Sequence, residues 1–412
     1  MYNLLHKIKI KIKSIPFLYQ NIISIRKRIR YSIIYCKSGK LYSLEQFIHE
    51  IPTTQVLFRK DIKLAYSPPQ FDNNVLKSAI FEDKIYTQYA IKSENVLFMG
   101  NSNLIISHNK VLYDLPFYDD DHRIDCTDSK IAKIDKAKLL YIKTQKMKIS
   151  KAIWMGGNYS FNYYHFLYEF AVKFLLLETL DIPTKIPIFL DQICFQVSQF
   201  KNIIDILNTK RYPLMSIGEN FCYLTNVLFF INAPNFIPPN FLDINDIKAE
   251  DVQFDISLLH KLRKTLLPYS SKKVFSEKIF VSRKNASGRR KFNEDEIIGF
   301  FSELGFEVVC LETLSIGDQI AMFNQAKYIV GGSGAAFTNI LFCNDQCKCI
   351  LFQKYCLPLS IFSTIAHVAG ADLRYITEEA TVGKRKYESL HDEFEIDITH
   401  LKNQLLSWDF FK

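Results

Sequence analysis

The sequence predicts an α/β fold, and three observations support this class. From residue 278 onward, short continuous apolar runs alternate with amphipathic runs of helical spacing. Residues 151–232 repeat the alternation less regularly. The chain has 412 residues, of which 48% are hydrophobic, enough to bury a large core and to favour two domains. Because continuous apolar strands that alternate with helices form parallel sheets covered on both faces, we expect two Rossmann-like domains facing across a cleft.

The C-terminal half contains the clearer series of elements. Strands are expected over 278–283, 306–312, 328–332, 348–353 and 372–377, and helices over 293–305, 315–326, 335–342 and 359–370. Two helix starts are marked by residue pairs typical of capping boxes, Asn293 with Glu296 and Ser315 with Asp318. Ligands of open α/β sheets bind outside the carboxyl ends of the strands, so the cleft is the expected site.

The N-terminal half is predicted from weaker patterns. Hairpin strands are expected over 95–100 and 103–115, further strands over 151–157, 185–191 and 226–232, and helices over 162–180 and near 195–208. A proline-rich connection, residues 232–243, separates the halves. We therefore expect a basic N-terminal arm over 1–45, a Rossmann-like domain with added hairpins over 46–245 and a second Rossmann-like domain over 246–412.

The net charge of +9 is concentrated at the N-terminus. Ten basic residues precede the first acidic residue, Glu45, and without them 42 basic residues face 43 acidic ones. Nucleic-acid binding is not expected, because basic residues would then recur across the folded part. The arm's interleaved isoleucines suit an anionic membrane surface, and the alternative is an arm that covers the domain. No run of eighteen apolar residues and no secretory signal are found, so we expect a protein peripheral to the membrane.

No metal or cofactor is expected from the sequence. The nine cysteines are an odd number scattered through apolar segments, which indicates buried thiols in a reducing compartment. Cys343, Cys347, Cys349 and Cys356 crowd together but lack the paired C-x-x-C form of zinc sites. The acidic run at residues 119–121 is interpreted as a solvated loop rather than a metal-binding D-x-D motif.

A turn of small residues, Gly332, Ser333 and Gly334, lies where a strand ends and the helix expected over 335–342 begins. Such a helix end favours an anion, and small residues let a phosphate approach the backbone; close backbone packing is the alternative. A nicotinamide cofactor is not expected, because the glycine fingerprint is incomplete.

An arginine-rich loop follows the first strand of the same predicted sheet. It carries Arg283, Arg289 and Arg290. Loops after parallel strands converge on one edge, so these guanidinium groups are expected to reach an anion bound at Gly334, unless the loop is merely solvated.

A base is suggested by His165 and Glu169, which lie four residues apart on the helix expected over 162–180. Histidine suits proton transfer near neutral pH, and the carboxylate would orient or activate it. The alternative is a core histidine satisfied by a backbone carbonyl.

In this order, the motifs resemble glycosyltransferase family 61. The arginine loop and glycine turn, within residues 280–342, are similar to the family's signature region. Residues 156–178 are similar to its block around a histidine, and residues 394–405 are similar to its closing helix. The resemblance implies a two-domain GT-B fold, an inverting, metal-independent mechanism and a nucleotide-sugar donor. It marks as donor-side positions Arg283, Arg290, Asn293, Gln319, Gly334 and Asn339. One departure is Ser333, where the family usually has histidine.

The expected function is transfer of a sugar from a nucleotide sugar to a glycan or lipid-linked glycan acceptor, in capsular or other surface polysaccharide biosynthesis. The expected place is the bacterial cytoplasm, at the inner face of the cell membrane. Two alternatives remain open: a transferase of another group, such as pyruvyl, on a similar scaffold, and a sugar-binding relative without full activity, which the departure at Ser333 motivates.

Overall fold

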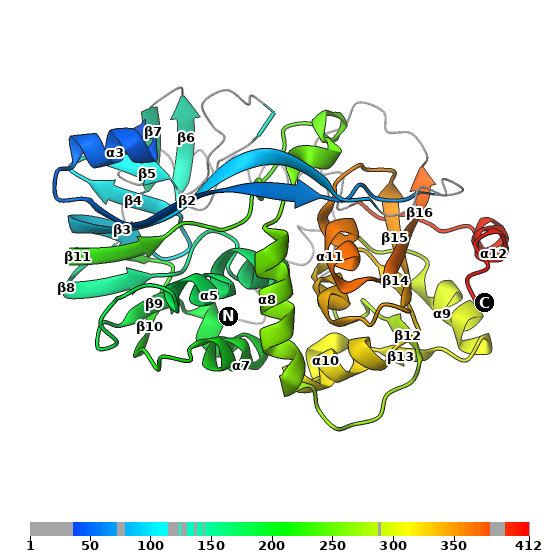
Figure 1. Ribbon diagram of the computed structural model, residues 1–412. Helices are drawn as coiled ribbons and strands as arrows, with labels where there is room; N and C mark the ends of the chain where they lie inside the picture. Colours follow the sequence, from blue (N-terminus) through cyan, green and yellow to red (C-terminus); the bar gives the residue numbers. More distant parts are fainter. Residues whose placement is uncertain are drawn as a thin grey trace, which may run out of the picture.

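The computed structural model describes residues 36–71, 79–113, 123–124, 130–135, 138–142, 145–286, 290–379 and 392–411. Most of the basic arm (residues 1–35), the acidic run at 119–121 and Arg289 lie outside these ranges. Within them the chain forms two sheets, which lie on opposite sides of helix α8 (Ile256–Leu266) in Figure 1. None of the helices in these ranges is both long and apolar enough to cross a bilayer.

The first sheet contains eleven strands in the described ranges and is mixed. Its order is β10-β9-β8-β11-β3-β4-β5-β1-β7-β6, with β2 paired to β3. The strands are β1 Cys36–Tyr42, β2 Gln55–Tyr66, β3 Phe81–Met99, β4 Leu104–Ser107, β5 Lys110–Tyr113, β6 Ile131–Asp135, β7 Lys138–Ile142, β8 Gln145–Trp154, β9 Ile188–Asp191, β10 Leu214–Ile217 and β11 Phe221–Ile231. Parallel pairing runs through β10, β9, β8 and β11, and also joins β1 to β5.

The rest of this sheet is antiparallel, which is compatible with the expected Rossmann-like domain that carries added hairpins. The predicted hairpin is confirmed: β4 pairs antiparallel with both β3 and β5. The cause of the mixed sheet is β3, nineteen residues long, which pairs antiparallel with β2 on one side and β11 on the other.

The long helix predicted over 162–180 is confirmed, with one irregularity. It consists of α4 (Tyr163–His165), a π-helical stretch η1 (Phe166–Ala171) and α5 (Lys173–Leu177). In the wider turn the N–H of Val172 donates to the carbonyl of Leu167, five residues earlier, at 3.2 Å. Such π-bulges are frequent at functional sites. The other helices of this half are α3 Leu44–Glu50, α6 Ile193–Gln196 and α7 Ser198–Leu207.

The second sheet is entirely parallel, as predicted, with five described strands in the order β13-β12-β14-β15-β16. The strands are β12 Lys278–Val281, β13 Glu307–Val309, β14 Tyr328–Gly332, β15 Lys348–Tyr355 and β16 Asp372–Glu379. The helices are α9 Glu294–Glu303, α10 Ile316–Gln325, η6 Ala335–Phe342, α11 Ile361–Ala369 and α12 Ile398–Ser407; η6 is a 3₁₀-helix. Short 3₁₀ turns are η2 Ile244–Asp246, η3 Ala249–Asp251, η4 Leu267–Tyr269 and η5 Leu311–Thr313.

The two predicted capping boxes have different outcomes. The hydroxyl of Ser315 accepts from the N–H of Asp318 at 3.1 Å and caps α10. Asn293 does not cap α9, because its side chain is bonded to the backbone of Ile396, accepting at 2.9 Å and donating at 3.0 Å. The interpretation of Asn293 as a capping residue was therefore wrong.

One large hydrophobic cluster of the described residues extends across both halves. It includes Ile153 and Phe166 from the N-terminal half, Ile329 and Phe337 from the C-terminal half, and the buried leucines of α8 between them. Burial of this continuous apolar surface is the main force that holds the halves together.

The antiparallel strands β2 and β3 also extend from the first sheet to the second half, and Figure 1 shows the arrow of β2 pointing towards β16. Beyond this crossing, Ala65 forms a backbone bridge with Phe254, with both hydrogen bonds at 2.9 Å. Farther along, the N–H of Ser67 donates to the hydroxyl of Thr364 at 2.9 Å, and that of Tyr375 donates to the carbonyl of Gln70 at 3.0 Å. Directional bonds therefore add to the shared core.

Candidate active site

The expected cleft is present as a cavity of about 520 Å³. The N-terminal half contributes Tyr159, Phe161 and His165 to its wall, and the C-terminal half contributes Arg290 and the turn that contains Ser333. The predicted base and the predicted anion site therefore face the same space.

The glycine turn is small because an arginine side chain lies against it. A Cβ atom on Gly334 would lie 1.8 Å from Nη1 of Arg283, and one on Gly332 would lie 2.8 Å from Cδ of the same residue. Close backbone packing, the alternative interpretation, applies one residue earlier, where a Cβ on Gly331 would lie 2.6 Å from the carbonyl oxygen of Val281. The small residues thus make room for the arginine side chain at Gly332 and Gly334 and for the neighbouring strand at Gly331.

The turn leads directly into η6. Gly334 has an extended backbone, with φ at 172°, and the N–H of Ser333 is used in the sheet, donating to the carbonyl of Phe352 at 2.8 Å. The first N–H groups of η6, from Ala335 onward, have no acceptor within the helix, as at any helix start. Since Gly334 and Ala335 line the cavity, an anion in the cavity would meet these donors.

The arginines predicted to converge on this turn do so where the structure describes them. Arg283 is largely buried, which lowers the pKa of its guanidinium, and the carboxylates of Glu294 and Glu312 oppose that shift. Nη1 of Arg290 donates to the hydroxyl of Ser333 at 3.4 Å, and its backbone has φ at 56°, a left-handed conformation uncommon for this residue type. A second hollow of about 500 Å³ shares Arg290 with the cleft and is also lined by Arg283. The two described arginines therefore lie where the hollows meet, and the second hollow is also lined by Glu294, Asp295 and Glu296.

Gln319 and Asn339, expected to be donor-side residues, lie in the interior instead. The amide of Asn339 is fully buried and donates to Oε1 of Gln319 at 2.8 Å, and Gln319 donates to the carbonyls of Leu311 and Leu314 at 3.0 and 3.2 Å. Neither residue lines the cleft. The structure therefore places both donor-side candidates among buried amides behind the cavity wall and not in it.

These buried amides connect the two halves of the site. The hydroxyl of Tyr163, on α4, donates to Oδ1 of Asn339, on η6, at 2.9 Å. One turn later, the hydroxyl of Tyr168 donates to the carbonyl of Thr338 at 3.1 Å. Burial raises the pKa of both tyrosines, so both hydroxyls stay protonated as donors. The helix that carries His165 is therefore fixed against the helix that begins at the glycine turn.

His165 and Glu169 are in direct contact, as their spacing predicts. Nδ1 of the imidazole is hydrogen-bonded to Oε1 of Glu169, and the side chains are 14% and 5% exposed. Because a carboxylate only accepts, Nδ1 is the nitrogen that donates in this contact, and in the neutral imidazole the lone pair is then on Nε2. The ring of Tyr159 stacks on the imidazole at 5.2 Å between centroids, and Tyr164 contacts it edge-on at 5.1 Å. The imidazole is oriented by its surroundings, as a general base requires.

The loop that precedes this helix is held by a residue that the sequence reasoning missed. Asp191, at the end of β9, accepts from the N–H groups of Gly157 and Asn101 at 2.9 and 2.6 Å. Burial raises its pKa to about 6, against the opposing effect of these bonds. The next N–H, of Asn158, donates to Oδ1 of Asn103 at 2.7 Å. The sequence did contain a signal for this residue, because Asp191 is a carboxylate at the end of the strand predicted over 185–191.

Comparison with known proteins identifies the family to which the segment around this cleft belongs. A mixed α/β chain with an oriented histidine and a cationic turn in one cleft has the features of a group-transfer enzyme. The family model described as Glycosyltransferase 61 matches residues 163–350, which include His165, Glu169, Arg283 and the glycine turn. This match indicates a glycosyltransferase and confirms the predicted resemblance: the segment is a glycosyltransferase family 61 domain. No curated protein matches the chain.

Proposed function

We propose that the chain is an inverting, metal-independent glycosyltransferase that moves a sugar from a nucleotide-sugar donor to a hydroxyl of a glycan acceptor. The observation that carries the proposal is the single cavity of about 520 Å³ lined both by His165 and by Arg290, Ser333 and Gly334. Transfer requires a base on the acceptor side and charge stabilisation on the leaving-group side, and the cavity offers both.

The leaving nucleoside diphosphate would be bound at the glycine turn. As the sugar leaves, negative charge grows on a phosphate oxygen. The guanidinium groups of Arg283 and Arg290 and the first N–H groups of η6 are fixed donors for that charge. Ser333 adds a hydroxyl donor, which serves where the family usually has histidine. No resident cofactor is needed for this step.

The acceptor would be activated by His165. Its Nε2 takes the proton of the acceptor hydroxyl while the oxygen attacks the anomeric carbon, and the bond from that carbon to the diphosphate oxygen breaks. Glu169 stabilises the imidazolium that results, and the proton then passes to solvent. Attack from the side opposite the leaving group inverts the anomeric configuration.

This assignment gives the two halves of the chain different tasks, as in a GT-B-type enzyme. Residues 46–245 would hold the acceptor and residues 246–412 the donor. Phe161, whose side chain is 59% exposed at the cavity wall, offers an apolar ring face on which an acceptor sugar can stack.

Thermal shift measurements with nucleoside diphosphates test donor binding. We expect a cognate diphosphate to raise the melting temperature of the wild-type protein and of the control Arg59→Ala, whose arginine lies on β2 and pairs with Glu45 of α3. The rise should be lost in Arg290→Ala. Equal shifts in all three proteins would contradict the assignment of the cationic turn. If none of the diphosphates shifts the melting temperature, a donor of another class, such as a pyruvyl donor, would be favoured.

A second assay separates an enzyme from a sugar-binding relative. Hydrolysis of the cognate nucleotide sugar by the wild-type protein, and its loss in Arg290→Ala, is the result expected of a transferase. Binding without turnover in the wild-type protein would instead support the sugar-binding alternative.

The arm suggests where the enzyme works. Eight of its ten basic residues lie within residues 1–35, so we propose peripheral attachment to the anionic inner face of a bacterial membrane, with surface polysaccharide as the product. Deleting residues 1–35, which leaves β1 in place, should abolish binding to vesicles that contain anionic lipid. Continued binding of the deleted form at low salt would contradict this proposal.

A further inference from the structure

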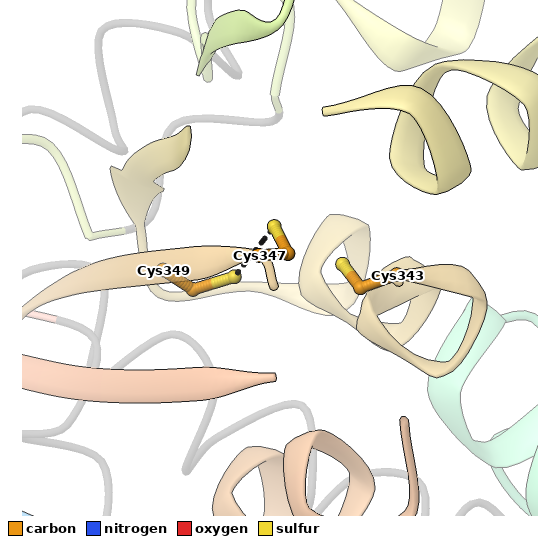
Figure 2. A group of neighbouring side chains, drawn as sticks. All are labelled: Cys343, Cys347 and Cys349. Atoms are coloured by element: carbon orange, nitrogen blue, oxygen red, sulfur yellow. Dashed lines mark hydrogen bonds between the residues drawn. The ribbon is translucent and has the colours of Figure 1, made fainter. Parts of the chain in front are cut away.

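A group of three cysteines lies away from the cleft. Cys343 follows η6, Cys349 lies at the start of β15, and Cys347 lies in the turn between them. All three are fully buried, and their sulfur atoms lie within 4.8 Å of one another. Figure 2 shows the sulfur of Cys343 directed towards the other two. Cys356, which the sequence places near them, is not part of the group among the described residues.

The separations match those of thiolates that share one metal ion. Two sulfurs that each bind an ion at about 2.3 Å are about 3.8 to 4.0 Å apart in tetrahedral or trigonal geometry. Sγ of Cys347 and Sγ of Cys349 are 3.7 Å apart. The distances from Sγ of Cys343 to the other two sulfurs are at most 4.8 Å. Each would have to shorten by less than 1 Å to complete a trigonal set of three sulfurs around one ion.

We propose that Cys343, Cys347 and Cys349 form a three-coordinate site for Cu(I). Soft thiolates select Cu(I), zinc or iron–sulfur clusters, and structural zinc is almost always four-coordinate. Among the residues that the structure describes, no histidine, acidic residue or further cysteine joins the three sulfurs. A monovalent soft ion with three ligands fits this set best.

The surroundings offset part of the negative charge that three thiolates leave around one Cu(I). Arg263, on α8, donates from its guanidinium to the carbonyls of Leu341 and Cys343 at 2.8 and 2.6 Å, so a cation lies beside the cysteine loop. Binding of Cu(I) would release thiol protons to solvent.

The location assigns this ion a structural task. Gly334 precedes η6 at the cleft, whereas Cys343 follows its other end, where the parallel strand β15 begins. An ion at the three sulfurs would join the end of η6 to the start of β15. It would therefore hold the helix whose first turn faces the cleft, without taking part in sugar transfer.

Copper retention tests the site. Anaerobically reduced, full-length protein is loaded with Cu(I) and challenged with the chelator bathocuproine disulfonate. We expect the wild-type protein and the control Cys194→Ala, a buried cysteine outside the group, to retain about one copper per chain. Cys347→Ala should retain less than a tenth of that amount while keeping its far-ultraviolet circular dichroism.

A second measurement needs no variant and so does not depend on folding of Cys347→Ala. In partially denaturing urea, bound Cu(I) should slow alkylation of the three cysteines by iodoacetamide at least tenfold and leave Cys194 and Cys222 unchanged. The proposal is overturned if the wild-type protein retains no copper, if Cys347→Ala retains as much as the wild type, or if zinc is retained in preference to Cu(I).

Discussion

Replacing Gly334 with alanine should weaken nucleotide binding with little effect on folding. The backbone there is extended, with φ at 172°, a conformation that any residue adopts. The new methyl carbon would lie 1.8 Å from Nη1 of Arg283, whereas ordinary contact begins at 3.4 Å. The guanidinium group must therefore move by about 1.6 Å, the difference between the two distances.

The size of the effect follows from what that movement removes. A hydrogen bond to a charged group contributes about 1.5 to 3 kcal/mol, and each 1.36 kcal/mol is a factor of ten. We therefore expect nucleoside diphosphate affinity to fall by about 10- to 100-fold. Turnover should fall at least as much, because displacing a positioned group by about 1 Å costs on the order of 100-fold.

The assay is calorimetric titration of the cognate diphosphate, with Gly299→Ala as the matched control. Gly299 lies in α9 with no atom within 4 Å of an added Cβ, so its replacement should leave affinity unchanged. A double-mutant cycle identifies the cause: in an Arg283→Ala background, Gly334→Ala should have almost no further effect. Wild-type affinity in Gly334→Ala, or full additivity in the cycle, would refute the reasoning.

Three further substitutions test the rest of the site. His165→Ala should leave diphosphate affinity intact and lower turnover by about two to four powers of ten, since only proton removal is lost; unchanged turnover would exclude the base assignment. Tyr163→Phe leaves the buried amide of Asn339 without its donor and should lower the free energy of unfolding in urea by about 1 to 3 kcal/mol; an unchanged midpoint would show that this bond contributes nothing. The pKa of Asp191 is raised from 3.8 to about 6, so the folded state binds the proton more tightly. The unfolding free energy should therefore fall as pH rises from about 4 to about 6, by at most roughly 3 kcal/mol from this residue. Asp191→Asn should lack that contribution, and parallel pH profiles of the two proteins would contradict it.

The C-terminal sheet was predictable from the sequence because its strands are short and apolar throughout. The run that became β15 is largely buried and flanked by helices, so local pattern and final environment agree. The mixed sheet was not predictable in the same way. Strand β3 combines an exposed polar start with a buried end, and β11 inserts between β8 and β3. Such an order depends on pairing between distant segments, which periodicity does not encode.

In the candidate site, too, some contacts could be predicted from the sequence and others could not. The contact of His165 with Glu169 follows from helical spacing, and the approach of Arg283 to the glycine turn follows from the convergence of loops after parallel strands. The task of Asn339 did not follow, because an amide binds a ligand or a buried partner according to what the fold brings near it. Its partner Tyr163 is 176 residues away in the chain.

The crossing of β2 and β3 from one half to the other bears on how substrates reach the cleft. Backbone bonds at Ala65 and Gln70 attach the end of β2 and the segment after it to the second half of the chain. The two halves that line the cleft therefore cannot move apart here without breaking these bonds. In the proposed function, donor and product would then enter and leave without a closing movement, little conformational entropy would be spent on closure, and selectivity would depend on a shape that exists before the sugar arrives.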